Sequence, residues 1–201
     1  YGLDYDNNTY DQPEVIKNFL NKDEVDFILN YCKKNINMIN GMVGDFKTEN
    51  SIRTNKIGWI EKFKFNEMVN LYKKLGLLIN EDIKKFENLQ ISKYNRGEYY
   101  KQHFDQTPKN DTPLISDYFI DNPRMKTLII YLNDDYQGGE TNFVNLNKSY
   151  KLNCGDALLF NIFNKNQDQV HYLSEHEGKM IENGEKWIAS IWVRKYEYKF
   201  N

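Results

Sequence analysis

The feature of this sequence that most constrains its fold is a series of short strand-like runs, separated by turn residues, that begins near residue 88. Short runs rich in β-branched and aromatic residues are typical of antiparallel sandwiches and barrels. The candidate strands are NLQISKYN, EYYKQHFDQ, MKTLIIYLN, GETNFVNL, DALLFNI and EKWIASIWVRKYEYK. The connection between the second and third runs is long for a hairpin, and long connections often carry function.

Two segments before residue 88 have helical periodicity instead. Asn21 and Glu24 have the form of a capping box, and the apolar residues that follow predict a helix over 22–35. From Asn66 onward, a second stripe of apolar residues at helical spacing predicts another helix. Between the two helices, the sequence predicts a polar loop that leads into a strand near 57–60. With 201 residues, we expect a single domain over 1–201, with a helical N-terminal part over about 1–87 and a β core over about 88–201.

Composition and charge exclude several classes of protein. A hydrophobic fraction of 40% excludes a disordered chain, and a net charge of -2 offers no basic footprint for a phosphate backbone, so no nucleic-acid partner is expected. No apolar run approaches the roughly 20 residues of a membrane span, and the N-terminus shows no apolar signal segment. The sequence therefore favours a soluble protein, cytoplasmic by default, with no membrane partner.

A candidate metal site begins with His103 and Asp105, which lie two residues apart and would share one face of a strand. Taken singly, such a pair is more often a hydrogen-bonded surface pair than a metal site. Two imidazoles and a carboxylate, however, form the ligand set of non-haem Fe(II) oxygenases. His171 and His176 are five residues apart, so on one continuous strand only one of them could supply the third ligand. The pattern alone leaves both open.

The stretch HEGKMIENGEKW places Gly184 eight and Lys186 ten residues after His176, and in this the sequence resembles the prolyl 4-hydroxylase type of 2-oxoglutarate- and Fe(II)-dependent dioxygenases. The resemblance covers roughly 88–195 and includes GGET, RMKTLIIYLN, GDALLF and a tyrosine nine residues before His103. It implies a mainly β protein with flanking helices, a double-stranded β-helix (jelly-roll) barrel whose N-terminal helices pack on the major sheet. It also favours His176 over His171, because the family spacing to the lysine fits His176.

The resemblance implies that His103, Asp105 and His176 bind the metal and are the catalytic residues. It also implies that Lys186 anchors the cosubstrate 2-oxoglutarate. A lysine in an otherwise apolar strand supports this role, since a buried charge needs a counter-ion. The further cofactor-binding candidates are Tyr131, Tyr94, Ser190 and Trp192, of which the last two share strand parity with Lys186.

Arg53 and Tyr100 are candidate substrate residues. One interpretation makes Arg53 a solvated arginine and Trp59 a core residue, and makes Tyr100 an ordinary packing residue. In the other, Arg53 lies on a loop over the barrel mouth, where the family holds its peptide. The segments 112–123 and 41–58 are then candidate covering loops.

The implied activity is hydroxylation of a C–H bond, with Fe(II), 2-oxoglutarate and O2 as cofactors and ascorbate as reductant. The resemblance favours conversion of peptidyl proline to 4-hydroxyproline with release of succinate and CO2, so a peptide or protein is the expected partner. Two alternatives stay open: a hydroxylase of a small molecule or another side chain, and a catalytically inactive barrel that acts as a binding module. Asp105 argues against a halogenase, and the absence of a basic surface disfavours nucleobase repair.

Overall fold

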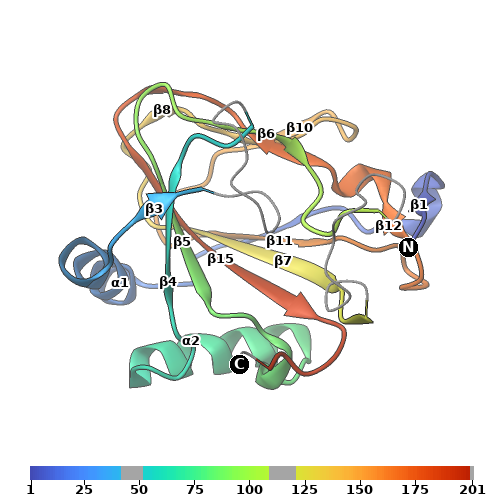
Figure 1. The fold of residues 1–201 in the computed structure, drawn as a ribbon, viewed down its shortest axis with the longest axis horizontal. Helices are drawn as coiled ribbons and strands as arrows, with labels where there is room; N and C mark the ends of the chain where they lie inside the picture. Colours follow the sequence, from blue (N-terminus) through green and yellow to red (C-terminus); the bar gives the residue numbers. More distant parts are fainter. Residues whose placement is uncertain (42–51, 109–120, 200–201) are drawn as a thin grey trace.

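The computed structural model describes residues 1–41, 52–108 and 121–199. Residues 42–51 of the candidate covering loop 41–58, and residues 112–120 of the candidate loop 112–123, therefore lie outside the described residues. The described elements form two helices and a set of strands arranged in two main sheets (Figure 1). No helix among the described residues is long and apolar enough to span a membrane.

Both predicted helices are present. Helix α1 spans Lys22–Asn35, and its N-terminus is a capping box in which Asn21 accepts from the Glu24 backbone N–H and the Glu24 side chain accepts from the Asn21 backbone. Helix α2 spans Asn66–Ile79 and ends at Asn80, whose left-handed conformation terminates the helix. Three short 3-10 helices are η1 (Asn7–Thr9), η2 (Ile83–Lys85) and η3 (Tyr172–Ser174).

Each of the six predicted strand runs contains a strand, and further short strands join them. The strands are β1 (Leu3–Asp4), β2 (Glu14–Ile16), β3 (Ile39–Asn40), β4 (Lys56–Ile60), β5 (Leu89–Tyr94), β6 (Tyr100–His103), β7 (Arg124–Tyr131), β8 (Gln137–Gly138), β9 (Thr141–Phe143), β10 (Lys148–Tyr150), β11 (Ala157–Asn161), β12 (Val170–His171), β13 (His176–Gly178), β14 (Ile181–Asn183) and β15 (Lys186–Arg194).

The strands build a barrel from a major sheet of order β2-β11-β7-β15-β5-β4-β3 and a minor sheet of order β10-β9-β13-β6. Figure 1 shows α2 below the major sheet and β6, β8 and β10 above it. The segment before residue 88 is thus not purely helical, because β2, β3 and β4 extend the major sheet at its two edges. The mainly β architecture, with helices packed on the major sheet, agrees with the jelly-roll prediction.

Two hydrophobic cores lie on opposite faces of the major sheet. On β15, Ala189 and Ile191 pack in an outer core with α1 and α2, while Ile188 packs in an inner core with residues of the minor sheet. This split follows from the alternation of side chains along a strand. Polar residues that face the inner core are therefore enclosed between the two sheets, where the candidate site lies.

Candidate metal centre and cosubstrate pocket

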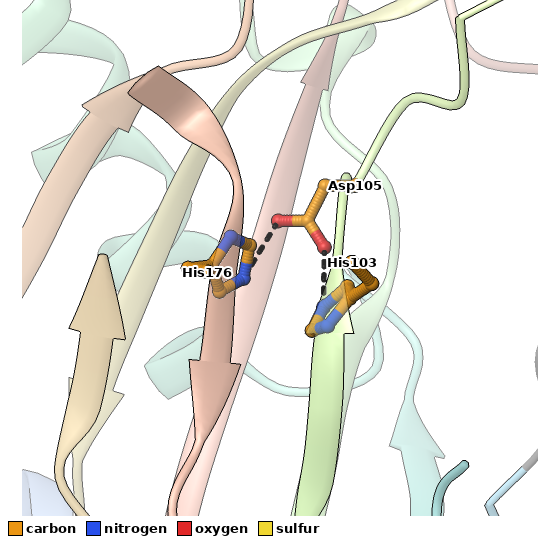
Figure 2. A group of neighbouring side chains, drawn as sticks. All are labelled: His103, Asp105 and His176. Atoms are coloured by element: carbon orange, nitrogen blue, oxygen red, sulfur yellow. Dashed lines mark ion pairs between the residues drawn. The ribbon is translucent and has the colours of Figure 1, made fainter. Parts of the chain in front are cut away.

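His103, Asp105 and His176 converge between neighbouring strands of the minor sheet (Figure 2). Strands β6 and β13 are antiparallel, and His103 lies directly opposite His176 in the register. Asp105 follows the end of β6 by two residues, yet its carboxylate lies 3.5 Å from Nε2 of His103 and 3.8 Å from Nε2 of His176. One ligand atom from each of the three residues lies within 4.8 Å of the others, which is close enough for all three to hold one metal ion.

Hydrogen bonds orient both imidazoles for metal binding. Nδ1 of His103 lies 2.8 Å from the carbonyl oxygen of Lys101, and Nδ1 of His176 lies 2.9 Å from that of Ser174. A carbonyl oxygen only accepts, so each Nδ1 carries a hydrogen, and each Nε2, directed toward Asp105, is the nitrogen available to a metal ion. Metal-binding histidines in proteins are commonly held in this way by a second partner.

The charge state of the cluster also suits a divalent metal. Burial alone would raise the pKa of Asp105, but His176, His103 and a hydrogen bond of 2.6 Å from the Thr127 hydroxyl to Oδ2 hold it well below its ordinary value. Burial, with a further contribution from His103, lowers the pKa of His176 to about 4. At neutral pH the cluster thus offers an ionised carboxylate and a neutral imidazole, the forms that bind metals.

The residues fit Fe(II), because two imidazole nitrogens and one carboxylate oxygen are the donor set of non-haem iron oxygenases. The inner wall is aromatic, since the rings of Phe143 and Phe160 lie 5.4 and 4.9 Å from that of His176. Such a wall limits access of water to the coordination sphere. The cluster is therefore a candidate centre with positions left for ligands other than protein.

His171 lies outside this cluster. Its Nε2 lies 3.0 Å from the carbonyl oxygen of Asp6, its Nδ1 accepts from the backbone N–H of Leu173, and its ring stacks on Tyr10 at 4.6 Å. Both ring nitrogens are thus engaged, and His171 fastens the N-terminal segment to the barrel. His171 and His176 do not share a strand, because η3 separates β12 from β13.

Lys186 occupies a second polar position within the same interior. Its side chain is 2% exposed, and its ammonium donates to the carbonyl oxygen of Gly139 at 2.6 Å. No ion pair of Lys186 with a carboxylate occurs among the described residues. Burial lowers the pKa of Lys186 to about 7, and the charge of Glu140 offsets this only in part. A buried cation with so little compensation is suited to pair with an anionic ligand, which makes Lys186 a candidate anchor.

The rings of Tyr94 and Tyr131, two of the cofactor-binding candidates, lie beside this lysine, and their cofactor-binding role stays a prediction. Their ring centres lie 5.5 and 5.4 Å from the Lys186 ammonium, and Tyr94 is directly opposite Lys186 on β5. The Tyr131 hydroxyl is 2.7 Å from the hydroxyl of Thr141, so the two hydroxyls form a polar pair in the same wall. Lysine, hydroxyls and aromatic faces together fit a carboxylate attached to an apolar chain.

Ser190 and Trp192 are both buried on β15, and Trp192 lies well along the strand from Lys186. It is six residues from Lys186 on β15, a separation of roughly 20 Å along the strand. In the register Trp192 lies opposite Thr127, the residue that bonds to Asp105. Trp192 therefore lies toward the metal end of the interior and not beside Lys186, and its cofactor-binding role stays a prediction.

Arg124 is a residue near the metal end to which the sequence analysis gave no role. Its guanidinium stacks on the Trp192 ring at 3.9 Å, is paired with Glu87 at 2.7 and 2.8 Å, and contacts the Asp105 carbonyl oxygen at 3.4 Å. Arg194 also pairs with Glu87, at 2.6 Å. The sequence signal was weak, because only the scarcity of arginine in this chain distinguishes these residues.

Arg53 is buried, so the interpretation of it as a solvated arginine is wrong; it precedes β4 and forms an isolated bridge with Tyr100. Its side chain is 8% exposed, its guanidinium bonds to Asn55 at 2.8 Å and to Gln90 at 3.0 Å, and it stacks on Tyr100 at 4.4 Å. Tyr100 in turn stacks on His103 at 3.6 Å. The interpretation of Trp59 as a core residue is also wrong, since Trp59 is 44% exposed.

Comparison with known proteins agrees with this site. Residues 89–194, slightly more than half of the 201 residues, match the family model described as the 2OG-Fe(II) oxygenase superfamily. A putative prolyl 4-hydroxylase of Acanthamoeba polyphaga mimivirus is 31% identical over 94% of this chain and 76% of its own length. Prolyl 4-hydroxylase subunit alpha-1 of Homo sapiens is 23% identical over 95% of this chain, which spans only 36% of that subunit.

Solved structures show the same fold. A viral collagen prolyl hydroxylase from Paramecium Bursaria Chlorella virus-1, solved as a 2OG complex, has a TM-score of 0.73 and 24% identity, covering 92% of this chain and 97% of its own. A Trichoplax adhaerens prolyl hydroxylase, solved with a hypoxia inducible factor peptide fragment, has a TM-score of 0.65 and 21% identity, covering 90% and 82%. The family match, the fold and the converging ligands lead to one conclusion: the chain belongs to the 2OG-Fe(II) oxygenase superfamily, enzymes that use Fe(II), 2-oxoglutarate and O2.

Proposed function

We propose that this chain hydroxylates peptidyl proline to 4-hydroxyproline in a reaction that consumes 2-oxoglutarate and O2. The observation that carries the proposal is the shared interior of the barrel, which holds the His103, Asp105 and His176 cluster together with the buried ammonium of Lys186. The prolyl substrate is supported by the names of the relatives, among them the mimivirus protein that matches 94% of this chain.

In this proposal His103, Asp105 and His176 hold Fe(II), and the Lys186 ammonium pairs with the distal carboxylate of 2-oxoglutarate. The bound metal and cosubstrate supply the oxidation, in which one oxygen atom of O2 enters the C–H bond and the other enters succinate as CO2 is released. Tyr94 and Tyr131 shield the lysine and line the cosubstrate pocket. Ascorbate is proposed as the reductant that keeps the metal in its Fe(II) form.

The chain's own residues orient the ligand set. Thr127 fixes one carboxylate oxygen of Asp105, and the carbonyl oxygens of Lys101 and Ser174 fix the two imidazoles. Groups that are already oriented need no rearrangement as the reaction proceeds, which is a main source of catalysis in enclosed sites. Phe143 and Phe160 exclude water from the inner side of His176.

The substrate is proposed to approach on the side of the metal that Tyr100 and Trp192 flank. Tyr100 stacks on His103, and Trp192 carries the Arg124 guanidinium on its face. Aromatic rings and an arginine suit a proline ring and the carbonyl groups of a peptide. Arg53 is enclosed by Asn55 and Gln90, so we assign it to the support of Tyr100.

The test is succinate release from 2-oxoglutarate with Fe(II) and ascorbate, in the presence of a panel of proline-containing peptides. The proposal predicts that one or more peptides stimulate succinate release and gain the mass of one oxygen atom on a proline. The matched control for each peptide replaces that proline by alanine and should give no gain.

The other outcomes separate the alternatives. Succinate release that no peptide stimulates would contradict the prolyl substrate and favour a small molecule or another side chain. An Fe(II)-bound protein that binds 2-oxoglutarate but never releases succinate would favour a binding module without turnover.

A further inference from the structure

The hydroxyl group of Tyr136 is buried without a hydrogen-bond partner among the described residues. The whole side chain is 4% exposed, and the oxygen atom is inaccessible to solvent. A buried hydroxyl that makes no hydrogen bond is destabilising, because it has lost its hydrogen bonds to water. Such a group in a native structure needs an explanation, and a ligand that completes its hydrogen bond is one.

The Tyr136 ring is part of the wall around Lys186. The Lys186 ammonium lies 6.0 Å from the ring centre, and Tyr136 packs in the same inner core as Tyr94 and Tyr131. Gly139 makes this packing possible: a Cβ atom there would lie 3.2 Å from Cε2 of Tyr136, 3.4 Å from Cδ of Lys186 and only 2.3 Å from Ile181. The absence of a side chain at Gly139 thus lets the tyrosine ring approach the lysine stem.

The position of Tyr136 is fixed by Lys151. The Lys151 ammonium donates to the carbonyl oxygen of Tyr136 at 2.5 Å and lies 4.8 Å from the centre of its ring. Tyr136 therefore does not owe its orientation to its hydroxyl. The hydroxyl is left available for a partner that the protein itself does not supply.

A carboxylate bound beside Lys186 would need more hydrogen-bond donors than Lys186 alone provides. The Lys186 ammonium has three hydrogens, of which the Gly139 carbonyl takes one, and the Tyr131 hydroxyl is paired with Thr141. A carboxylate has about four acceptor positions, more than one lysine can satisfy. Tyr136, whose ring belongs to the same wall, carries a further O–H donor that has no partner among the described residues.

We propose that Tyr136 is a cosubstrate-binding residue whose hydroxyl donates a hydrogen bond to the distal carboxylate of 2-oxoglutarate beside Lys186. The proposal rests on the assignment of the chain as a 2-oxoglutarate-dependent oxygenase, but it does not depend on the identity of the hydroxylated substrate. Two observations support the assignment of Tyr136 to the pocket: its ring packs against Lys186 at Gly139, and its hydroxyl has no partner among the described residues.

The experiment measures binding without turnover. Wild-type protein and the Tyr136→Phe variant are loaded with Mn(II) in place of Fe(II), and the dissociation constants of 2-oxoglutarate and of pyruvate are measured by calorimetry. Pyruvate retains the 2-oxo acid group that chelates a metal but lacks the distal carboxylate. The control variant Tyr10→Phe removes another buried phenol, whose hydroxyl donates to the Asn161 carbonyl oxygen at 2.8 Å outside the pocket.

We expect Tyr136→Phe to raise the dissociation constant of 2-oxoglutarate about tenfold, equivalent to about 1.4 kcal/mol, and to leave that of pyruvate unchanged. The metal-free variant should melt no lower than wild type, because the hydroxyl loses no hydrogen bond. Tyr10→Phe should show the opposite pattern, with a lower melting temperature and unchanged 2-oxoglutarate binding.

Two results would overturn the role of Tyr136. One is an unchanged dissociation constant for 2-oxoglutarate in Tyr136→Phe, and the other is an equal loss of affinity for 2-oxoglutarate and pyruvate. If the wild-type protein itself binds Mn(II) but no 2-oxoglutarate, the oxygenase assignment fails together with this inference. If the protein binds 2-oxoglutarate but hydroxylates no proline, the proposed prolyl substrate fails, and the Tyr136→Phe measurement still decides whether Tyr136 binds 2-oxoglutarate.

Discussion

The two ends of the barrel interior hold their charges in different ways. At the metal end, the Asp105 carboxylate has two imidazoles and the Thr127 hydroxyl within reach, so its charge is already stabilised. At the other end, Lys186 is buried, and its hydrogen bond within the described part of the chain goes to the carbonyl oxygen of Gly139. Burial accordingly holds the pKa of Lys186 well below that of an ordinary lysine. The residues around Asp105, in contrast, hold the pKa of its carboxyl group below the ordinary value and so keep it ionised.

The metal end thus has its three candidate ligands oriented in advance, whereas Lys186 would gain its charge partner only from the proposed anionic ligand. The metal end is organised before any ion binds, since backbone carbonyls orient both histidines. At the lysine end, no carboxylate of the described residues pairs with Lys186, so the proposed anion would complete the site. Substitutions at the metal end should therefore abolish metal binding, while those at the lysine end should change cosubstrate affinity and leave the metal in place.

The largest effect is expected at the metal ligands. His176→Ala or Asp105→Ala should abolish stoichiometric Fe(II) binding and reduce succinate release to background, because each removes one of three protein ligands. Metal content after anaerobic loading, followed by activity, measures both effects. His171→Gln is the control and should keep the metal, since His171 contacts Asp6 and Leu173 instead. Loss of metal in His171→Gln with retention in His176→Ala would reverse the assignment.

The next effect concerns the lysine end alone. Lys186→Ala should raise the dissociation constant of 2-oxoglutarate about 100-fold, since loss of a buried charge partner typically weakens binding by ~2–5 kcal/mol. Its Fe(II) content should stay at the wild-type level. Lys93→Ala is a matched control, because Lys93 is paired with Glu185 and lies outside the pocket. Unchanged 2-oxoglutarate affinity in Lys186→Ala would place the anchor elsewhere.

A pH dependence should follow from the same lysine. The pKa of Lys186 is about 7 in the folded protein, against 10.5 for an ordinary lysine, so the unfolded chain holds the proton more tightly between these values. The metal-free protein should accordingly gain stability as pH rises from about 7 toward 10.5. A carboxylate needs the protonated ammonium, so 2-oxoglutarate affinity should fall above about pH 7. Calorimetry in buffers of different ionisation enthalpy would detect proton uptake, and binding without proton uptake at pH 8 would refute the linkage.

The smallest effects are expected from two threonines whose hydroxyls support the two ends, Thr127 at the metal end and Thr141 at the lysine end. Thr127→Val should weaken metal affinity about tenfold, the lower range for removal of a hydrogen bond that orients a ligand. Thr141→Val, which removes the partner of the Tyr131 hydroxyl, should weaken 2-oxoglutarate binding and leave metal affinity unchanged. Titrations of the two variants with both ligands would test this, and equal effects at both ends would show that the ends are coupled.

The larger elements and the metal ligands could be predicted from the sequence because their signals are local. The capping box at Asn21 and the apolar stripes mark α1 and α2, and alternation of apolar residues marks the long strands. His176 was identifiable only through its spacing to Gly184 and Lys186. Gly184 has a φ of +79°, in the region that favours glycine, and it leads the chain into β15.

The remaining features depend on contacts that a linear pattern does not contain. Strand β13 is three residues long and carries no apolar alternation. Strand parity placed Trp192 on the correct face of β15, but parity does not measure distance along a strand. Arg124 is held near the metal end by Glu87, 37 residues away in the chain, and the Tyr136 ring lies beside Lys186 because Gly139 contacts that lysine, 47 residues away.

The most direct test of the account is an anaerobic titration of the Fe(II)-loaded protein with 2-oxoglutarate, followed by visible absorbance. The account predicts a charge-transfer band that requires both Fe(II) and 2-oxoglutarate, that is absent in Asp105→Ala, and that develops at higher 2-oxoglutarate concentration in Lys186→Ala. A wild-type protein that binds Fe(II) but develops no band at saturating 2-oxoglutarate would contradict it.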